Sequence, residues 1–407
     1  MALDLSNVKK ATSFKEQFTV RAMVIGTIGS IILTASSMFV ALKASSLPWP
    51  IMFVTLFSMC LLKIMGNTNV NEINVTHTAM SAGSMVAGGL AFTIPGLFIL
   101  DNNAQIGVLE IGLCTISGTI LGLIFTSLLR KHFVEKAAMP YAMGQAAAEV
   151  LVVGDEGGKS MGYLGGSFAV SGIWTVLRDK LAVVPAMKLV PGLANYGSMT
   201  GLWFSPMLIA VGYLIGPITI GVWFLGWVIG DIGALYLGQT AFGWDAAFAS
   251  GIKSSLGLGW MVGVGFAIIA KVACNLEVTQ AVYVACIVAV ASGLTGDVMN
   301  DFKSGHELGS DPKAQWIGEV IGGIVGSVVA VAVLVVLVKA YGGGVFGTEM
   351  FPAAQAAAVA SVVGGIANVP VFIGGLVASV IVYFITPVFT MLGLGIYLPG
   401  FLTLTAV

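Results

Sequence analysis

Residues 316–339 read WIGEVIGGIVGSVVAVAVLVVLVK, and no residue between Glu319 and Lys339 is charged. A helix needs about 20 mainly apolar residues to cross a hydrocarbon core of about 30 Å. Because a helix satisfies its own backbone hydrogen bonds, such a segment is stable in lipid. This stretch therefore predicts a transmembrane helix.

The rest of the chain has the same character. Of its 407 residues, 57% are hydrophobic and 9% are charged, and the mean hydropathy is +0.98. Soluble domains carry about a quarter charged residues, so lipid is the solvent that fits this composition. Further apolar runs predict spans near 20–42, 47–65, 75–99, 106–129, 161–177, 203–230, 254–273, 278–296, 369–386 and 388–407. Two Ala-rich stretches, 137–152 and 351–366, suit half-helices or re-entrant segments. The predicted fold is an all-α polytopic membrane protein with about 11–13 transmembrane or re-entrant helices in two related repeats.

Several classes of function lack support in the sequence. The net charge of -1 gives no signal for nucleic acid as a partner. The four cysteines have no short paired spacing, so neither a metal site nor a disulfide framework is expected. The segment Gly154–Ser160 is one residue short of a phosphate loop, and no metalloprotease or nucleophile-elbow motif occurs. We expect no enzyme activity and no cofactor.

Basic residues indicate the orientation of the chain. They gather in the amino-terminal tail and after the fourth apolar run, as Lys9, Lys10 and Lys15, then Arg130, Lys131, His132 and Lys136, whereas the break near Asp101 has none. Loops rich in Lys and Arg stay in the cytoplasm. Four crossings between the two basic segments place both on that side. We expect a multi-pass protein of the plasma or inner membrane with a cytoplasmic amino terminus.

An internal repeat is visible at an offset of about 210 residues. The stretch Gln145–Ala148 recurs as Gln355–Ala358, Ser81–Gly83 is echoed by Ala291–Gly293, and Glu110 is matched by Glu319. We predict a first membrane repeat over 1–235 and a second, incomplete one over 236–407. Duplicated halves are typical of transporters, whose solute site lies at the repeat interface. A passive channel or pore is the main alternative, and a membrane-embedded enzyme is disfavoured.

Three polar patches interrupt the apolar pattern, and charges inside a bilayer are costly enough to be functional candidates. Glu149 lies in the Ala-rich stretch 137–152, which is either in the membrane or an interfacial helix. In the segment 296–307, Asp297 and Asp301 lie one turn apart if the helix continues, and paired carboxylates hold protons more tightly. A solvated loop is the alternative for that segment. In the third patch, Asn74, Thr78 and Ser81 share one helical face, which suits either a polar path or polar contacts between packed helices.

At these patches the sequence resembles the oligopeptide transporter family, which includes the yellow-stripe-like metal-chelate transporters. The family's patterns are matched by Glu72, Asn74, Thr78 and Ser81 to Gly83, by Pro140, Gly144 and Ala146 to Leu151, and by Gly296, Asp297, Met299, Asp301, Lys303, Gly305, His306, Gly309 and Pro312. Members commonly have about sixteen spans, so this chain is shorter, and it lacks an Asn-Pro-Val-Ser-Gly stretch expected between Ala270 and Val278.

The resemblance implies a secondary active transporter, usually proton-coupled, for short oligopeptides or peptide-like metal chelates. The expected partners are that small-molecule substrate, protons and membrane lipid, with a homo-oligomer possible. A non-autonomous fragment or subunit of a larger transporter is the alternative. The ion-coupling candidates are Glu149, Asp297, Asp301, Lys303 and His306, and the substrate-path candidates are Glu72, Asn74, His77, Thr78, Ser81 and Gln145.

Overall fold

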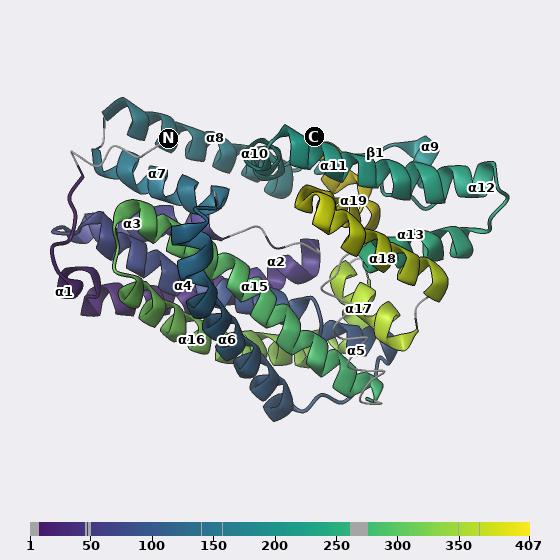
Figure 1. Cartoon of the computed structure of the whole chain (residues 1–407), viewed down its shortest axis with the longest axis horizontal. Coiled ribbons are helices and arrows are strands. Elements are labelled where there is room, and N and C mark those ends of the chain that lie inside the picture. The colour runs from purple at the N-terminus through teal and green to yellow at the C-terminus, as the bar shows by residue number, and fades with distance from the viewer. Residues whose placement is uncertain are drawn as a thin grey trace. The chain divides into compact units, whose positions relative to one another are not determined.

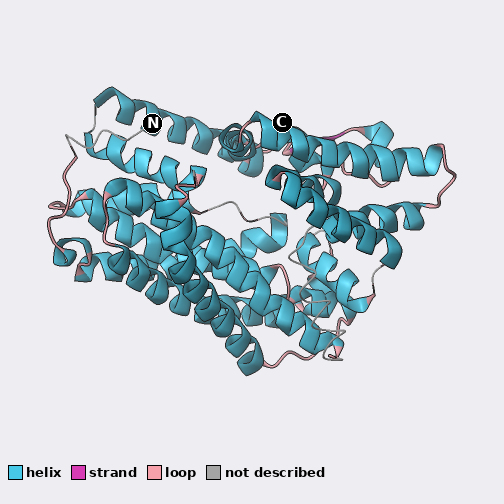
Figure 2. Cartoon of the chain, in the orientation of Figure 1, coloured by secondary structure: helices cyan, strands magenta, loops and turns pink. Residues whose placement is uncertain are grey.

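The structure is a computed structural model that describes residues 8–407, except 45–46, 48–49, 140, 157, 261–275, 349 and 366. Its described part is almost entirely helical, with one short antiparallel ribbon (Figure 2). The predicted all-α class is therefore confirmed. Pro140 and the second part of the predicted run 254–273 lie outside the described residues.

The helices form two compact units, each built from two separate stretches of sequence. Unit 1 comprises residues 1–162 and 276–360. It contains α1 (Phe14–Gln17), α2 (Val20–Ala44), α3 (Ile51–Met65), α4 (Val70–Ala91), α5 (Pro95–Leu100), α6 (Val108–Arg130), the π-helical turn η1 (Lys131–Lys136), α7 (Ala142–Glu156), α15 (Val278–Leu308), α16 (Pro312–Tyr341), the 3-10 turn η5 (Gly343–Val345) and most of α17 (Ala354–Gly364).

Unit 2 comprises residues 163–275 and 361–407. Strands β1 (Met187–Leu189) and β2 (Gly201–Trp203) pair in antiparallel register, with Lys188 opposite Leu202. Its helical elements are most of α8 (Gly158–Thr175), η2 (Val176–Lys180), α9 (Pro191–Ala194), α10 (Pro206–Ile215), α11 (Pro217–Trp227), η3 (Val228–Leu237), α12 (Gly238–Thr240), α13 (Ala246–Trp260), α18 (Val369–Ile385), η6 (Pro387–Thr390), α19 (Met391–Tyr397) and α20 (Gly400–Ala406).

Two of the helices that carry the polar patches, α4 and α15, have capped ends. The Asn69 side chain caps α4 by accepting a hydrogen bond from the amide of Glu72. Helix α15 begins with a capping box of Glu277 and Gln280 and ends at Gly309, whose φ of 70° suits glycine. The next helix starts only three residues later, so α15 and α16 form a hairpin with a short, rigid connection.

Helix α4 is the centre of unit 1. Nearly all of its residues are buried, because it packs against α2, α3, α15 and α16 (Figure 1). It runs antiparallel to α15, since Asn74 bonds to Ser304 and His77 to Asp301. A polar helix enclosed in this way can lie within a membrane, because its polar groups face other helices and not lipid.

Glycine allows the closest helix contacts in unit 1. On α16, a Cβ at Gly322 would clash with the carbonyl oxygen of Ala79, and one at Gly326 would clash with Gly83. On α6, Gly122 approaches the carbonyl oxygen of Ala291 in the same way. Small residues spaced four apart are typical of helix packing in membranes. The α4–α16 and α6–α15 contacts are therefore alike.

Six helical segments of the described residues are long and apolar enough to cross a membrane: Val20–Lys43, Val70–Leu100, Val108–Lys136, Pro217–Thr240, Val278–Leu308 and Pro312–Tyr341. The outer faces of α2 and α6 expose large apolar side chains, among them Val24, Ile28, Leu121 and Phe125. Water disfavours such continuous apolar faces, whereas lipid does not. These features support a multi-pass membrane protein.

Some predicted runs differ from the helices observed. The run 278–296 extends to Leu308, which makes 296–307 helical; the alternative of a solvated loop for that segment was wrong. Runs 203–230 and 388–407 are each divided into shorter elements, the first at Gly216 and Pro217. The predicted repeat boundary near residue 235 concerns sequence ancestry, which the compact units do not test, so it stays a prediction.

Candidate functional site

The polar patches on α4 and α15 meet inside unit 1. Because the two helices are antiparallel, the first half of α4 faces the last half of α15. The Nε2 of His77 lies 3.2 Å from Oδ1 of Asp301, and the Ser81 hydroxyl donates to Oδ2 of Asp301 at 2.5 Å. All three side chains are fully buried. Residues more than 200 positions apart in sequence thus form one cluster.

Two further carboxyl groups lie beside Asp301. Asp297 is one turn earlier on α15, and Glu319 comes from α16. Both are 0% exposed, and each interacts electrostatically with Asp301. No described group donates a hydrogen bond to either oxygen of Asp297 or of Glu319. We name Asp297, Asp301, Glu319, His77 and Ser81 the carboxyl cluster.

Amide and hydroxyl side chains extend from this cluster toward the amino-terminal tail. Ser304 donates to Oδ1 of Asn74 at 2.8 Å, and Asn74 donates to the Ser310 hydroxyl at 3.2 Å. Asn71 donates to that same hydroxyl at 3.0 Å and accepts from the amide of Ala11. This end of unit 1 is therefore polar from the buried carboxyls to the tail.

Glutamine and asparagine fix the helices around the cluster. Gln315 of α16 donates to the backbone carbonyl of Asp301 at 2.8 Å. Asn300 accepts from the amide of Gly144, which joins α7 to α15. A Cβ on Gly144 would clash with the carbonyl of Asn300. The glycine at this position therefore permits the close approach of α7 to α15.

Glu72 belongs to a separate ion-pair network. It accepts from Arg21 at 2.7 Å and also from the hydroxyls of Thr19 and Thr68. Arg21 further donates to the backbone carbonyls of Gly66 and Asn67. These bonds tie α2 to the start of α4. Every described donor to Glu72 is thus a protein group that fixes the fold. Glu72 nevertheless remains one of the predicted substrate-path candidates.

The other candidates lie at different places. Thr78 is buried and donates to its own helix at Val75. Lys303 is buried, and its Nζ pairs with Glu307 at 2.8 Å. His306 and Glu149 are exposed, and Gln145 is half-buried. The structure therefore brings together Asp297, Asp301, His77, Ser81 and, through Ser304, Asn74, but not Glu149 or His306.

Sequence reasoning missed two buried acidic residues. Glu319 was noted only as the repeat mate of Glu110, although a lone carboxyl in an apolar run was itself a usable signal. In unit 2, Asp231 of η3 is buried and pairs with Lys253 of α13 at 2.7 Å. The Ser198 hydroxyl also donates to Asp231. No charged residue lies between Lys188 and Asp231, so the same signal applied there.

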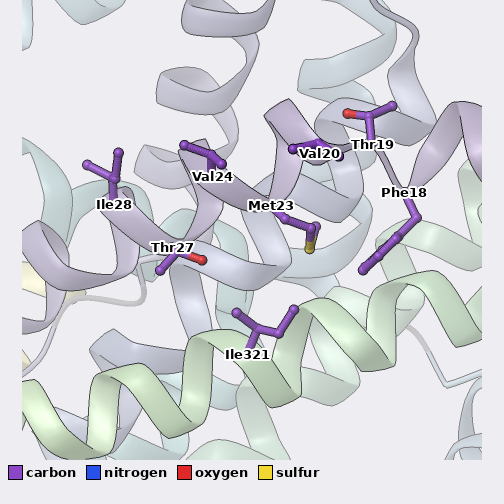
Figure 3. A pocket seen from close by; sticks show the side chains of 8 residues that line it. All are labelled: Phe18, Thr19, Val20, Met23, Val24, Thr27, Ile28 and Ile321. Atoms are coloured by element: carbon purple, nitrogen blue, oxygen red, sulfur yellow. The ribbon is translucent and has the colours of Figure 1, made fainter.

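An apolar pocket of about 510 Å³ lies on α2 and α16 of unit 1. Figure 3 shows its lining side chains, which are Phe18, Thr19, Val20, Met23, Val24, Thr27, Ile28 and Ile321. None of them is charged. Ile321 and Glu319 are two positions apart on α16 and so point in different directions. The pocket is therefore distinct in chemistry from the carboxyl cluster.

Long apolar helices, close glycine contacts and an enclosed polar centre define the chain as a multi-pass membrane protein. Its sequence matches the family described as OPT oligopeptide transporter protein over residues 17–250 and 240–407. The chain belongs to this family, and the resemblance drawn from its motifs is confirmed.

A curated relative is a Haemophilus influenzae (strain ATCC 51907 / DSM 11121 / KW20 / Rd) protein named "Putative oligopeptide transporter". The two are 31% identical over 182 residues, which is 42% of this chain. The aligned part spans 27% of the relative's length.

Proposed function

We propose that this chain carries out, alone or as part of a larger assembly, secondary active transport of short oligopeptides or peptide-like metal chelates, driven by protons. Membership of the family supports the transport of peptides. The observation that carries the proton coupling is the carboxyl cluster. Its three buried carboxyls and its histidine come from α4, α15 and α16, which all lie in candidate membrane spans. Ionisable groups at such positions are typical of proton relays.

The basic segments support a cytoplasmic amino terminus in the cell membrane. The tail bonds to Asn71 at the start of α4. Arg130, at the end of α6, lies over the ring of Phe302 on the last half of α15, 5.2 Å from its centroid. Both basic segments are therefore at the same end of unit 1. By the positive-inside rule that end is cytoplasmic. The polar side chains between the carboxyl cluster and the amino-terminal tail then face the cytoplasm.

A subunit or fragment of a larger transporter is the second candidate. It is favoured by one observation, namely that the match covers only part of the curated relative. In that case the carboxyl cluster keeps its coupling role, and a second chain completes the substrate path. Purified protein reconstituted alone distinguishes the two, because only a self-sufficient transporter shows saturable uptake.

Replacing Asp297 tests the proposed coupling. We expect Asp297→Asn to abolish uptake driven by an imposed pH gradient in proteoliposomes, because the amide cannot release a proton. Uptake is measured over a panel of short peptides and metal chelates, with monodispersity in detergent as the control for folding. Wild-type rates from folded Asp297→Asn would remove Asp297 from the coupling role, and unsaturable wild-type flux without pH dependence would indicate a passive pore.

A further inference from the structure

The three acids of the carboxyl cluster differ in the number of hydrogen bonds that they receive. Asp301 receives a hydroxyl bond from Ser81 and lies within bonding distance of His77 Nε2. Asp297 and Glu319 receive none from the described residues. All three are fully buried. A buried carboxylate ion without donors is far less stable than a neutral acid, which takes up a proton instead.

We propose that Asp301 is the charged acceptor of the cluster and that Asp297 and Glu319 are two carboxylic acids, each carrying a proton and donating it toward Asp301. The Glu319 carboxyl interacts directly with Asp301. Asp297 interacts with Ser81, whose own hydrogen is donated to Asp301. A proton on Glu319 can be donated to the Asp301 carboxylate, and a proton on Asp297 can be donated to the Ser81 hydroxyl oxygen, which itself donates to Asp301. Such charge-assisted bonds are the stronger kind.

The neighbouring charges are already paired, so they leave this assignment unchanged. Lys303 of α15 pairs with Glu307, and Arg130 of α6 pairs with Glu135. On α2, Arg21 pairs with Glu72. His77 is the remaining titratable group of α4 that contacts the cluster, and its Nδ1 has no described partner. The contact of His77 with Asp301 is made through Nε2, at 3.2 Å.

Glu319 is thus one of the proton-carrying groups, and the role of Glu319 in transport rests on the proposed function. When water reaches the cluster, Asp297 and Glu319 can each release one proton and become carboxylates. The cluster thus has one fixed charge and two exchangeable protons, contributed by α15 and α16.

Infrared spectroscopy of the purified protein tests the protonation states without any transport assay. Protonated carboxylic acids absorb in a carbonyl band that is separate from the carboxylate bands. At neutral pH we expect that band to decrease in Asp297→Asn and in Glu319→Gln, and to decrease further in the double variant. Glu110→Gln is the matched control, because Glu110 is the exposed repeat mate of Glu319, and it leaves the band unchanged. An unchanged band in both cluster variants would overturn the proposal.

Thermal stability supplies a second measurement for the case in which bands overlap. An amide retains an N–H that can donate to Asp301, so Asp297→Asn and Glu319→Gln are expected to melt within a few degrees of the wild type. Asp301→Asn removes the negative charge and one of the two acceptor oxygens, and it is expected to melt clearly lower. Equal losses in all three would contradict the assignment. Absence of uptake together with these results would reject the proposed function alone.

Discussion

At the residue scale, most polar side chains of this apolar chain have specific partners, but sequence cannot say which. Glu72 and Asp301 are both acidic residues in polar patches of candidate spans. The structure gives Glu72 a guanidinium and two hydroxyls, and gives Asp301 a histidine and a serine. The guanidinium of Arg21 offsets the charge of Glu72, whereas Asp301 belongs to a cluster of acids. The surroundings of the two acids differ because the fold places Arg21 beside Glu72 and Glu319 of α16 beside Asp301.

Arg21 provides a test of the structural role of Glu72. We expect Arg21→Gln to destabilise the protein by about 3 kcal/mol, the lower end of values for breaking a buried ion pair, because the Arg21 side chain is 28% exposed. Chemical or thermal unfolding in detergent measures the change. In the double variant Arg21→Gln with Glu72→Gln, most of the loss is expected to be recovered. No recovery would show that the pair itself contributes little.

At the element scale, the sequence predicted most helices, because long apolar runs and caps are local signals. The described helices α2, α6 and α16 lie close to the runs 20–42, 106–129 and 316–339. The end of α15 was harder to place, because its last part is polar and resembles a loop. That part is helical because α4 and α16 supply partners for Asp301 and Ser304. Tertiary contacts, which a single sequence does not display, decided that boundary.

Glycines on α6 allow the helix packing to be tested within one element. Gly122 lies against the backbone of α15, whereas nothing lies within 4 Å of a Cβ built on Gly112. We expect Gly122→Val to lower the melting temperature strongly, because it separates α6 from α15. Gly112→Val, on the same helix, is expected to change it little. Similar effects of the two substitutions would show that this helix contact is not as close as described.

At the scale of the whole molecule, the helix contacts of unit 1 can be compared with the predicted repeat, which stays a prediction. Under an offset of about 210 residues, α4 corresponds to α15 and α6 to α16. Helix α16 packs its Gly322 and Gly326 on α4, and α6 packs its Gly118 and Gly122 on α15. Thr119 of α6 also bonds to Ser327 of α16 at 2.9 Å. Because α4 and α15 are antiparallel, a true duplication of these helices would have copies of opposite orientation, as in many transporters.

The orientation of unit 1 can be measured by site-directed labelling. In a background without native cysteines, Lys10→Cys and Lys136→Cys are expected to react with a membrane-impermeant thiol reagent only from the cytoplasmic side. Asn103→Cys, in the exposed connection between α5 and α6, is expected to react from the opposite side. Labelling of Lys10→Cys and Asn103→Cys from one face would refute the predicted topology.

Helix α4 also has a consequence for how the protein is made. It presents Asn74, His77 and Ser81 to partners on α15 and at Ser310, which the ribosome synthesises roughly 200 residues later. At about 5–20 residues per second, α4 waits on the order of 10–40 s for them. Because unpaired polar side chains are costly in lipid, we expect lateral release of α4 from the insertion machinery to be delayed until the later hairpin arrives.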